Sequence, residues 1–475
     1  MPGWTNLREL VRREFEQSQQ EGKSPAALAA LQAEFAALAP SDEAALITLQ
    51  GKLVALPVDP AFPFQEPDDL AGIQALRKDS RVFVAPAADE ALLDQLYGAW
   101  LGRAAGCALG KPIEMIGLAP PACTSQKTWR DIKRYLTAIS PDEWPLRDYV
   151  PAHSPAEPEL PRMICPASTR EKIAFMESDD DIRYTVLGQM VMAEHGAAFT
   201  TESVASKWIG KLTYGSVCTA ETQAYRNLIA RYDFHEGNGW KFGPLPIDWH
   251  WVVTYLNPYR EWIGAQIRVD SYAYAAPGDP ALAADFAWRD VRLSHVKNGL
   301  YGSMLCAAMI SAAFVTKDVR EIVAAGLGEI PATSRLHAEM CAVVALCEKH
   351  GNDFANFEAV FDGICDLLGH YSTTHTNNNA GVCVAAVLLS GGDYHKGITA
   401  AVMAGFDTDC NGATVGSILG AMNGARKLPE HWTGRLNDTL RSELADYHPI
   451  AISECARRSF EIVKKVRATP AAPAK

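Results

Sequence analysis

Residues 89–110 read DEALLDQLYGAWLGRAAGCALG, and this is the stretch that decides the fold. The spacing of its apolar residues predicts one long helix. Glycine recurs in it every four residues, at Gly98, Gly102, Gly106 and Gly110. A glycine inside a helix costs up to about 1 kcal/mol relative to alanine, so four on one face indicate that a second helix or a ligand approaches very closely. The spacing alone leaves both explanations open.

A second glycine ladder lies near the other end of the chain. The segment GATVGSILGAMNG, residues 412–424, has the same four-residue spacing. Its members are Gly412, Gly416, Gly420 and Gly424. Residues four apart share one face of a helix, so each ladder is a smooth stripe. We predict that the two stripes face each other.

Most of the remaining chain favours helices. After residue 171, segments rich in alanine and leucine follow one another through short loops, and no sustained strand-like alternation occurs. We therefore predict an all-α protein whose main part is a compact multi-helix domain.

Changes in composition indicate the boundaries. Residues 1–85 are expected to form a helical N-terminal extension, which ends in a stretch interrupted by prolines. Residues 86–468 are expected to form one domain. Within it, the proline-rich residues 117–170 predict an insertion that crosses the surface. Residues 469–475 are expected to be a disordered tail.

The charge balance excludes several partners. The chain has 44 Lys plus Arg against 56 Asp plus Glu, and a formal net charge of -12. Because this charge repels phosphate backbones and anionic lipid surfaces, we expect neither nucleic acid nor a membrane as a partner. The 11 cysteines contain no CxxC pair, which favours buried free thiols in a reducing compartment. With no signal-type N-terminus, we expect a cytoplasmic location.

The first acidic segment is Glu177-Ser178-Asp179-Asp180-Asp181, directly before an apolar helix. One carboxylate would be enough to cap that helix and favour its dipole. Adjacent aspartates repel one another, and a hard divalent cation neutralises clustered oxygens well. We prefer the cation to the alternative of an acidic helix start on the surface.

The second acidic segment, GFDTDCNGAT, joins two apolar helices at residues 405–414. Its carboxylates, Asp407 and Asp409, are therefore expected close to the core. Buried carboxylates are paired, protonated or bound to metal, and no Lys or Arg lies between Lys396 and Arg426. A metal site is preferred here to simple helix capping.

Three motifs resemble those of the ADP-ribosylglycohydrolase family. GAWLGRAAGCALGKPIE, ESDDDIRYTVLG and GFDTDCNGATVGSILGAMNGA occur in the family's order between residues 98 and 425. The resemblance implies an all-α catalytic domain, here residues 86–468, that binds two magnesium or manganese ions. By matching motifs, the implied metal-site residues are Glu114, Ser178, Asp179, Asp180, Asp407, Asp409 and Cys410.

Three residues depart from the family pattern. Cys410 and Asp181 stand where threonine is usual, and Cys107 replaces an aspartate. An added carboxylate strengthens binding of a hard cation, whereas a thiol suits magnesium poorly. These departures indicate a divergent, bacterial-type branch.

The implied chemistry is hydrolysis of a ribosyl C1″–N or C1″–O bond through an oxocarbenium-like state. Glu114, Asp180 and Asp409 are the predicted catalytic residues, with Glu114 as acid or base and Asp409 as a bridging ligand. A further set of residues is predicted to contact substrate. They are Asp181, Asp270, His295, Asn298, His375, Asn378 and Gly412.

The sequence therefore predicts a hydrolase that removes ADP-ribose, or a related ribosyl group, from a protein or a small molecule. Two alternatives remain: a ribonucleoside or ribosyl-metabolite hydrolase with the same metals, and a catalytically silent module that binds ADP-ribose. The absence of a dinucleotide fingerprint, a P-loop and a nucleophile elbow argues against dehydrogenase, kinase and esterase functions. The sequence does not predict the oligomeric state.

Overall fold

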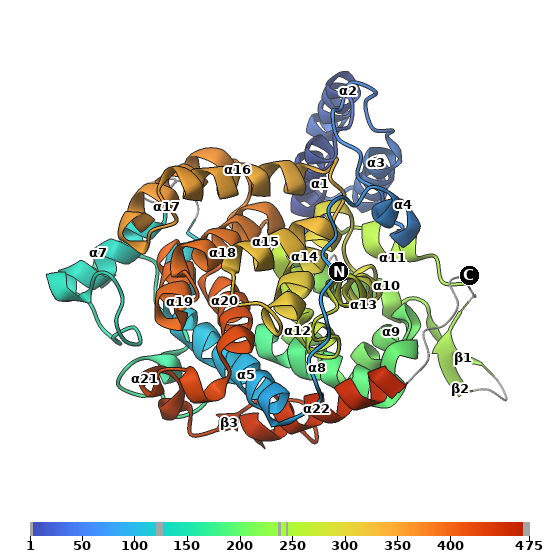
Figure 1. Cartoon of the computed structure of the whole chain (residues 1–475). Coiled ribbons are helices and arrows are strands. Elements are labelled where there is room, and N and C mark those ends of the chain that lie inside the picture. The colour runs from blue at the N-terminus through green and yellow to red at the C-terminus, as the bar shows by residue number, and fades with distance from the viewer. Residues whose placement is uncertain (1–2, 120–126, 236–238, 244–245, 469–475) are drawn as a thin grey trace.

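The computed structural model describes residues 3–119, 127–235, 239–243 and 246–468. The predicted tail, residues 469–475, lies outside these described residues. The all-α prediction is confirmed, since helices build almost the whole molecule (Figure 1). Two small antiparallel pairs of strands are additions that the sequence analysis did not predict: β1 (Tyr232–His235) with β2 (Gly239–Phe242), and β3 (Thr439–Leu440) with β4 (Ile450–Ala451).

The central helices are α5 (Glu90–Gly110), α8 (Asp180–His195), α14 (Lys297–Ala313), α18 (Thr376–Ser390), α19 (Tyr394–Met403) and α20 (Thr408–Asn423), and α22 (Ile452–Ala468) packs against α5 and α8 at the edge of the molecule. Around them lie α6 (Glu114–Gly117), α7 (Trp129–Ile139), α9 (Thr201–Lys211), α10 (Thr219–Ile229), α11 (Trp249–Thr254), α12 (Asp270–Tyr274), α13 (Pro280–Val291), α15 (Val319–Gly328), α16 (Arg335–Lys349), α17 (Phe357–Leu368) and α21 (Glu430–Thr433).

The two glycine ladders face each other, as predicted. α5 begins after Asp89, whose carboxylate caps the amides of Ala91 and Leu92, and it packs antiparallel against α20. A Cβ atom on Gly102 would lie 2.2 Å from the carbonyl oxygen of Gly416, and one on Gly106 would lie 2.0 Å from that of Gly412. No side chain fits at such distances, so the backbones of the two helices are in direct contact.

Both ladder helices are buried on every side. From Gly98 to Gly110 all residues of α5 are buried, as are those of α20 from Thr408 to Met422. Neighbouring helices bond to some of their polar groups: the Tyr394 hydroxyl donates to the Gly102 carbonyl at 2.9 Å, and the Trp100 indole donates to Ser459 Oγ at 3.0 Å. Residues of both helices belong to the main core, and the two helices run side by side in Figure 1.

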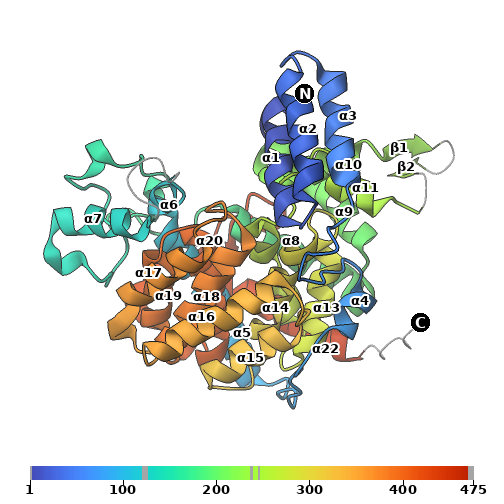
Figure 2. The same cartoon turned by 90° about the horizontal axis from the view of Figure 1, so that it is seen from above.

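The N-terminal extension forms a separate group of helices on one side of the domain: α1 (Leu7–Gln20), α2 (Pro25–Ala37), α3 (Glu43–Ala55) and the short α4 (Leu70–Ala75). The first three project from the remainder (Figure 2) and share a small apolar cluster with Ala220, Leu256 and Tyr259. Charged contacts complete the join. The buried Arg260 guanidinium pairs with Glu14 at 2.7 Å and with Glu21 at 2.8 Å.

The proline-rich residues 117–170 carry α7 at the edge of the molecule (Figure 2). They also contribute buried residues to the main core, among them Tyr135, Leu146 and Tyr149. Trp129 and Trp144 stack with ring centroids 6.2 Å apart, and both contact phenylalanines of α17. In the described ranges, no helix is both long and apolar enough to cross a bilayer.

Candidate metal centre

The turn between α19 and α20 places the second acidic segment. Gly405 and Phe406 have φ of +81° and +58°, and a Cβ on Gly405 would lie 2.3 Å from Thr128 Oγ1. Only glycine can occupy position 405 without strain. The turn is held by Asn379, whose Oδ1 accepts from the Asp407 amide at 3.1 Å. Asp407 occupies the N-cap position of α20, yet its side chain makes no capping bond. Its carboxylate is therefore left for another purpose than capping.

The end of α5 brings the first motif to the same place. A Cβ on Gly110 would lie 2.4 Å from the amide nitrogen of Asp409, so the two backbones touch at this point. The Thr408 hydroxyl donates to the Gly110 carbonyl at 2.9 Å. A short 3₁₀ turn, Lys111–Ile113, follows and delivers Glu114 at the start of α6. The glycine ladder thus sets the position of Glu114 relative to Asp409.

The first acidic segment arrives from the start of α8. Asp179 caps this helix, since its Oδ1 accepts from the Asp181 amide at 2.9 Å. Asp181 is fully buried, whereas Ser178 and Asp180 are partly exposed. The Ser178 hydroxyl oxygen accepts from the Arg183 guanidinium at 2.8 Å. One aspartate is enough for the cap, and the other two carboxylates remain beside it.

The three segments meet around Asp409. The structure contains four groups of three residues whose ligand atoms lie within 4.8 Å of one another inside each group, and Asp409 belongs to three of these groups. The groups are Glu114–Asp407–Asp409, Cys107–Asp179–Asp409, Asp181–Asp409–Cys410 and Asp179–Asp180–Asp181. We call the eight residues in these groups the acidic cluster. The structure therefore brings together the predicted metal-site residues other than Ser178, which adjoins Asp179 in the chain.

The donor set of the acidic cluster fits a hard divalent cation. Asp407 and Asp409 are 6% and 3% exposed, and an oxygen of each has no hydrogen-bond partner among the described residues. Buried carboxylate oxygens without partners are costly, and a hard cation is what such oxygens bind. Glu114, Asp407 and Asp409 offer oxygen only, which suits magnesium or manganese.

Crowding changes the acidity of the acidic cluster. Burial, together with the charge of Asp179, raises the pKa of Asp409 to about 7 and that of Asp180 to about 6. Burial and three neighbouring aspartates hold the pKa of Glu114 well above its ordinary value. Burial also raises the pKa of Asp179, but the Lys111 ammonium outweighs it and leaves that pKa below its usual range.

Two basic residues enter this region that the sequence analysis missed. Lys111 Nζ donates to Asp179 Oδ2 at 2.5 Å, and the fully buried Arg103 pairs with Asp181 at 3.1 Å and with Asp270 at 3.0 Å. Both lie in the quoted first motif, so their charge was visible. The carboxylates that Lys111 and Arg103 face depend on how α5 crosses α8, and the sequence did not show them.

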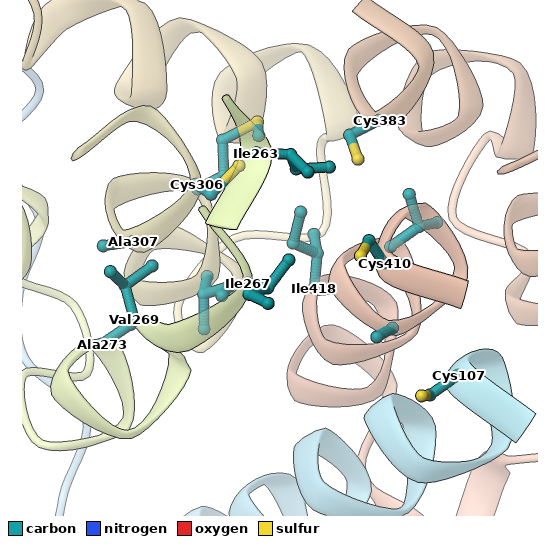
Figure 3. Packing of buried hydrophobic residues seen from close by; sticks show 14 of the residues in the cluster. Cys107, Ile263, Ile267, Val269, Ala273, Cys306, Ala307, Cys383, Cys410 and Ile418 are labelled. Atoms are coloured by element: carbon teal, nitrogen blue, oxygen red, sulfur yellow. The ribbon is translucent and has the colours of Figure 1, made fainter. Parts of the chain in front are cut away.

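The two cysteines of the acidic cluster are buried (Figure 3). Cys107 lies on α5 and Cys410 on α20, where its thiol donates to Asp181 Oδ2 at 3.1 Å. Burial and the surrounding aspartates raise the pKa of both thiols well above the ordinary value. Both are therefore neutral groups at neutral pH.

Several predicted substrate residues lie in other buried networks. Asn298 donates to Glu66 at 3.0 Å and to Glu261 at 2.8 Å, in the contact with the N-terminal extension. His295 shares a hydrogen bond of 2.8 Å with Ser294. Gly412 faces the backbone of Gly106 in the ladder. Their role in binding substrate remains a prediction.

The start of α18 reaches the acidic cluster through Asn379, but its other polar residues are held by local bonds. His375 Nδ1 accepts from the Asn377 amide at 3.1 Å and caps α18, and Asn378 donates to the Ser372 carbonyl at 2.8 Å. Asn379, which the sequence analysis did not select, is the one that holds the amide of Asp407. The run of three asparagines was the available signal, but it did not identify the member that faces the site.

Comparison with known proteins identifies a family over the part of the chain that contains these motifs. A sequence model of the ADP-ribosylglycohydrolase family matches residues 88–460, the range from α5 to within α22 that includes the whole acidic cluster. Forty-four chains of solved structures also resemble the protein. One of them, "ADP-ribosylglycohydrolase-related protein complex", is 17% identical, covers 80% of this chain and 100% of its own, and has a TM-score of 0.45. No curated protein matches the chain.

Proposed function

The chain belongs to the ADP-ribosylglycohydrolase family, and from that premise we propose that it hydrolyses the ribosyl C1″–N or C1″–O bond of an ADP-ribosylated protein or small molecule. The observation that supports this most directly is the meeting of Glu114, Asp407 and Asp409, with buried carboxylate oxygens that lack partners among the described residues. A glycoside hydrolase needs a positioned water and a carboxyl group that exchanges a proton. The acidic cluster supplies carboxyl groups for the proton exchange, and a divalent cation bound there would position the water.

The residues that would hold magnesium or manganese fall into two sets. Glu114, Asp407 and Asp409 form an all-oxygen set, and the aspartates of 179–181 form a second set that borders Asp409. These sets would serve the two ions that the sequence predicts, with Ser178 and Cys410 as further candidate ligands. A bound divalent cation supplies charge that lowers the pKa of water and orients ribose hydroxyls.

Glu114 is the proposed acid and base. It is partly exposed at the start of α6, whereas Asp407 and Asp409 are buried beneath it. Burial and neighbouring aspartates raise the pKa of its carboxyl in the metal-free chain, and a raised pKa is the direction that suits a group that gives a proton to a leaving group. Asp180 is likewise partly exposed, and its raised pKa of about 6 makes it the second candidate for proton transfer.

The test is a turnover panel with the purified chain in magnesium, in manganese and in EDTA. The substrates are ADP-ribosyl-arginine, an ADP-ribosyl-serine peptide, O-acetyl-ADP-ribose and ribonucleosides, with products identified by mass spectrometry. We expect metal-dependent release of ADP-ribose from at least one substrate, which would also identify the bond cleaved.

Two other outcomes would replace this proposal. Release of ribose from nucleosides alone would make the protein a ribosyl-metabolite hydrolase. No turnover of any substrate, together with calorimetric binding of ADP-ribose, would make it a binding module. Cys107 and Cys410 would then be the first residues to replace with the aspartate and threonine that are usual in the family.

A further inference from the structure

Lys111 is a buried cation inside the acidic cluster. Its side chain is only 4% exposed. Lys111 directly follows the C-terminal end of α5, where residues 104–110 are all glycine or apolar. Its ammonium donates to Asp179 Oδ2 at 2.5 Å and to the Ser178 carbonyl at 3.0 Å. The ammonium is thus a fixed positive charge.

The aspartates of 179–181 are therefore already paired in part. Asp179 faces Lys111, and Asp181 faces Arg103, which also pairs with Asp270. A divalent cation at Asp179 would have to share that oxygen with an ammonium group and would be repelled by it. Two fixed cations thus occupy the side of the acidic cluster that α8 contributes.

The other side of the acidic cluster is different. No ion pair joins Glu114, Asp407 or Asp409 to a basic side chain in the described part of the chain. Asp407 Oδ1 and Asp409 Oδ1 lack hydrogen-bond partners there as well. Without a basic partner, these carboxylates are neutralised by protons or by a cation from solution.

We propose that the acidic cluster has one tight divalent position, formed by Glu114, Asp407 and Asp409, and that the Lys111 ammonium takes the place of a second cation at Asp179. This inference rests on the proposed metal-dependent function and revises the prediction of two ions. It makes Lys111 a positioning residue that holds Asp179 and balances its charge. The second ion is then bound weakly in the native chain.

The experiment is a manganese titration of the full chain after treatment with a chelator. Free manganese is followed by electron paramagnetic resonance, and heat is followed by calorimetry. We expect one tightly bound ion per chain, with any second ion bound at least about 100-fold more weakly because of the Lys111 charge. Two ions of similar affinity, or no bound ion, would overturn the proposal.

A matched pair of variants tests the role of the ammonium. Lys111→Met removes the charge and keeps a similar volume, and we expect it to gain a second manganese within about tenfold of the first in affinity. Lys111→Arg keeps the charge and should keep one ion. A Lys111→Met chain that still binds one ion would contradict the proposal.

If Lys111→Met does not fold, Glu114→Gln in the otherwise native chain gives an independent test. Loss of the carboxylate charge should weaken the single position by at least about tenfold, and unchanged binding would overturn the assignment. None of these measurements uses a substrate. A chain that binds one manganese but is silent in the turnover panel would refute the proposed function and leave this inference standing.

Discussion

The helices α5 and α20 contact each other closely from one end to the other, and the two ends of this contact have opposite effects on stability. Along the glycine half, Gly98, Gly102 and Gly106 lie against the backbone of α20, and no charge is present on either stripe. At the acidic half, Gly110 touches the backbone of Asp409, and the carboxylates of both segments are forced together. The glycine half stabilises the fold through packing, whereas the acidic half costs stability until cations balance it.

This difference shows how a fold can support a site that is unfavourable by itself. Because glycine has no side chain, the two helices approach closely enough for their carboxylates to bind one metal ion. Breaking the glycine half should therefore remove both fold and site. Breaking the acidic half should remove the site and leave the fold.

The largest effect is expected from Gly102→Val. The new Cβ would lie 2.2 Å from the Gly416 carbonyl oxygen, which is backbone and cannot move aside. We expect a loss of more than about 4 kcal/mol in the free energy of unfolding, enough to prevent folding. Urea unfolding followed by circular dichroism measures it. A valine variant with native stability would show that the two helices are not in direct contact.

The second effect in size is expected from Asp409→Ala, in the acidic half. Asp409 is shared by three of the four ligand groups, so bound metal and turnover should fall together, with turnover reduced at least about 1000-fold. The helical circular dichroism spectrum should remain, because the ladder is intact. Asp366→Ala, at a carboxylate that is 69% exposed, is the control and should keep full activity. Retained turnover in Asp409→Ala would refute its role.

A smaller effect is expected from pH in EDTA, where no cation balances the acidic half. The pKa of Asp409 is about 7 in the folded chain, against an ordinary value of 3.8. Between these values the folded state binds more protons than the unfolded state, so stability should fall as pH rises from 5 to 8, on the order of 1 to 3 kcal/mol.

The control for this pH dependence is Asp409→Asn, which should flatten the slope. Excess manganese should flatten it as well, because a bound cation replaces the proton. Chemical unfolding at fixed pH values measures the slope. A slope of the opposite sign between pH 5 and 8 would contradict the crowding of carboxylates at this end.

The smallest effect, and the counterpart of Gly102, is expected from Gly51→Ala. Gly51 is an exposed glycine in α3, and nothing lies within 4 Å of a Cβ placed on it. Alanine there should stabilise the chain by about 0.5 to 1 kcal/mol, because only helix propensity changes. Thermal unfolding of the Gly51→Ala variant and of the native chain measures the difference in stability. Destabilisation would contradict the open space around position 51.

Much of this arrangement could be predicted from the sequence. The two ladders, the helix at 89–110 and the acidic segments are local patterns, because helical spacing and glycine both act through neighbours in the chain. The absence of a basic residue between Lys396 and Arg426 also predicted carboxylates without a local counter-ion. The structure bears this out for Asp407 and Asp409 among the described residues.

The partners of buried polar groups could not be predicted in this way. Lys111 and Arg103 stand within a quoted motif, but their carboxylates come from the start of α8 and from α12. Asn298 was selected as a polar residue in apolar surroundings, and the structure places it with Glu66 and Glu261. An ion pair depends on distances across the fold, and the spacing of residues along one segment does not specify them.

The sequence by itself determined the helical class, the close contact of two glycine stripes and the residues that carry charge near them. Only the tertiary structure decided that Asp409 stands at the centre of the acidic cluster, that Lys111 and Arg103 already balance its α8 side, and that Asn379 holds the turn at Asp407. The physical reason is that backbone preferences are local, whereas the free energy of a buried charge depends on every group that packing brings within a few ångströms of it.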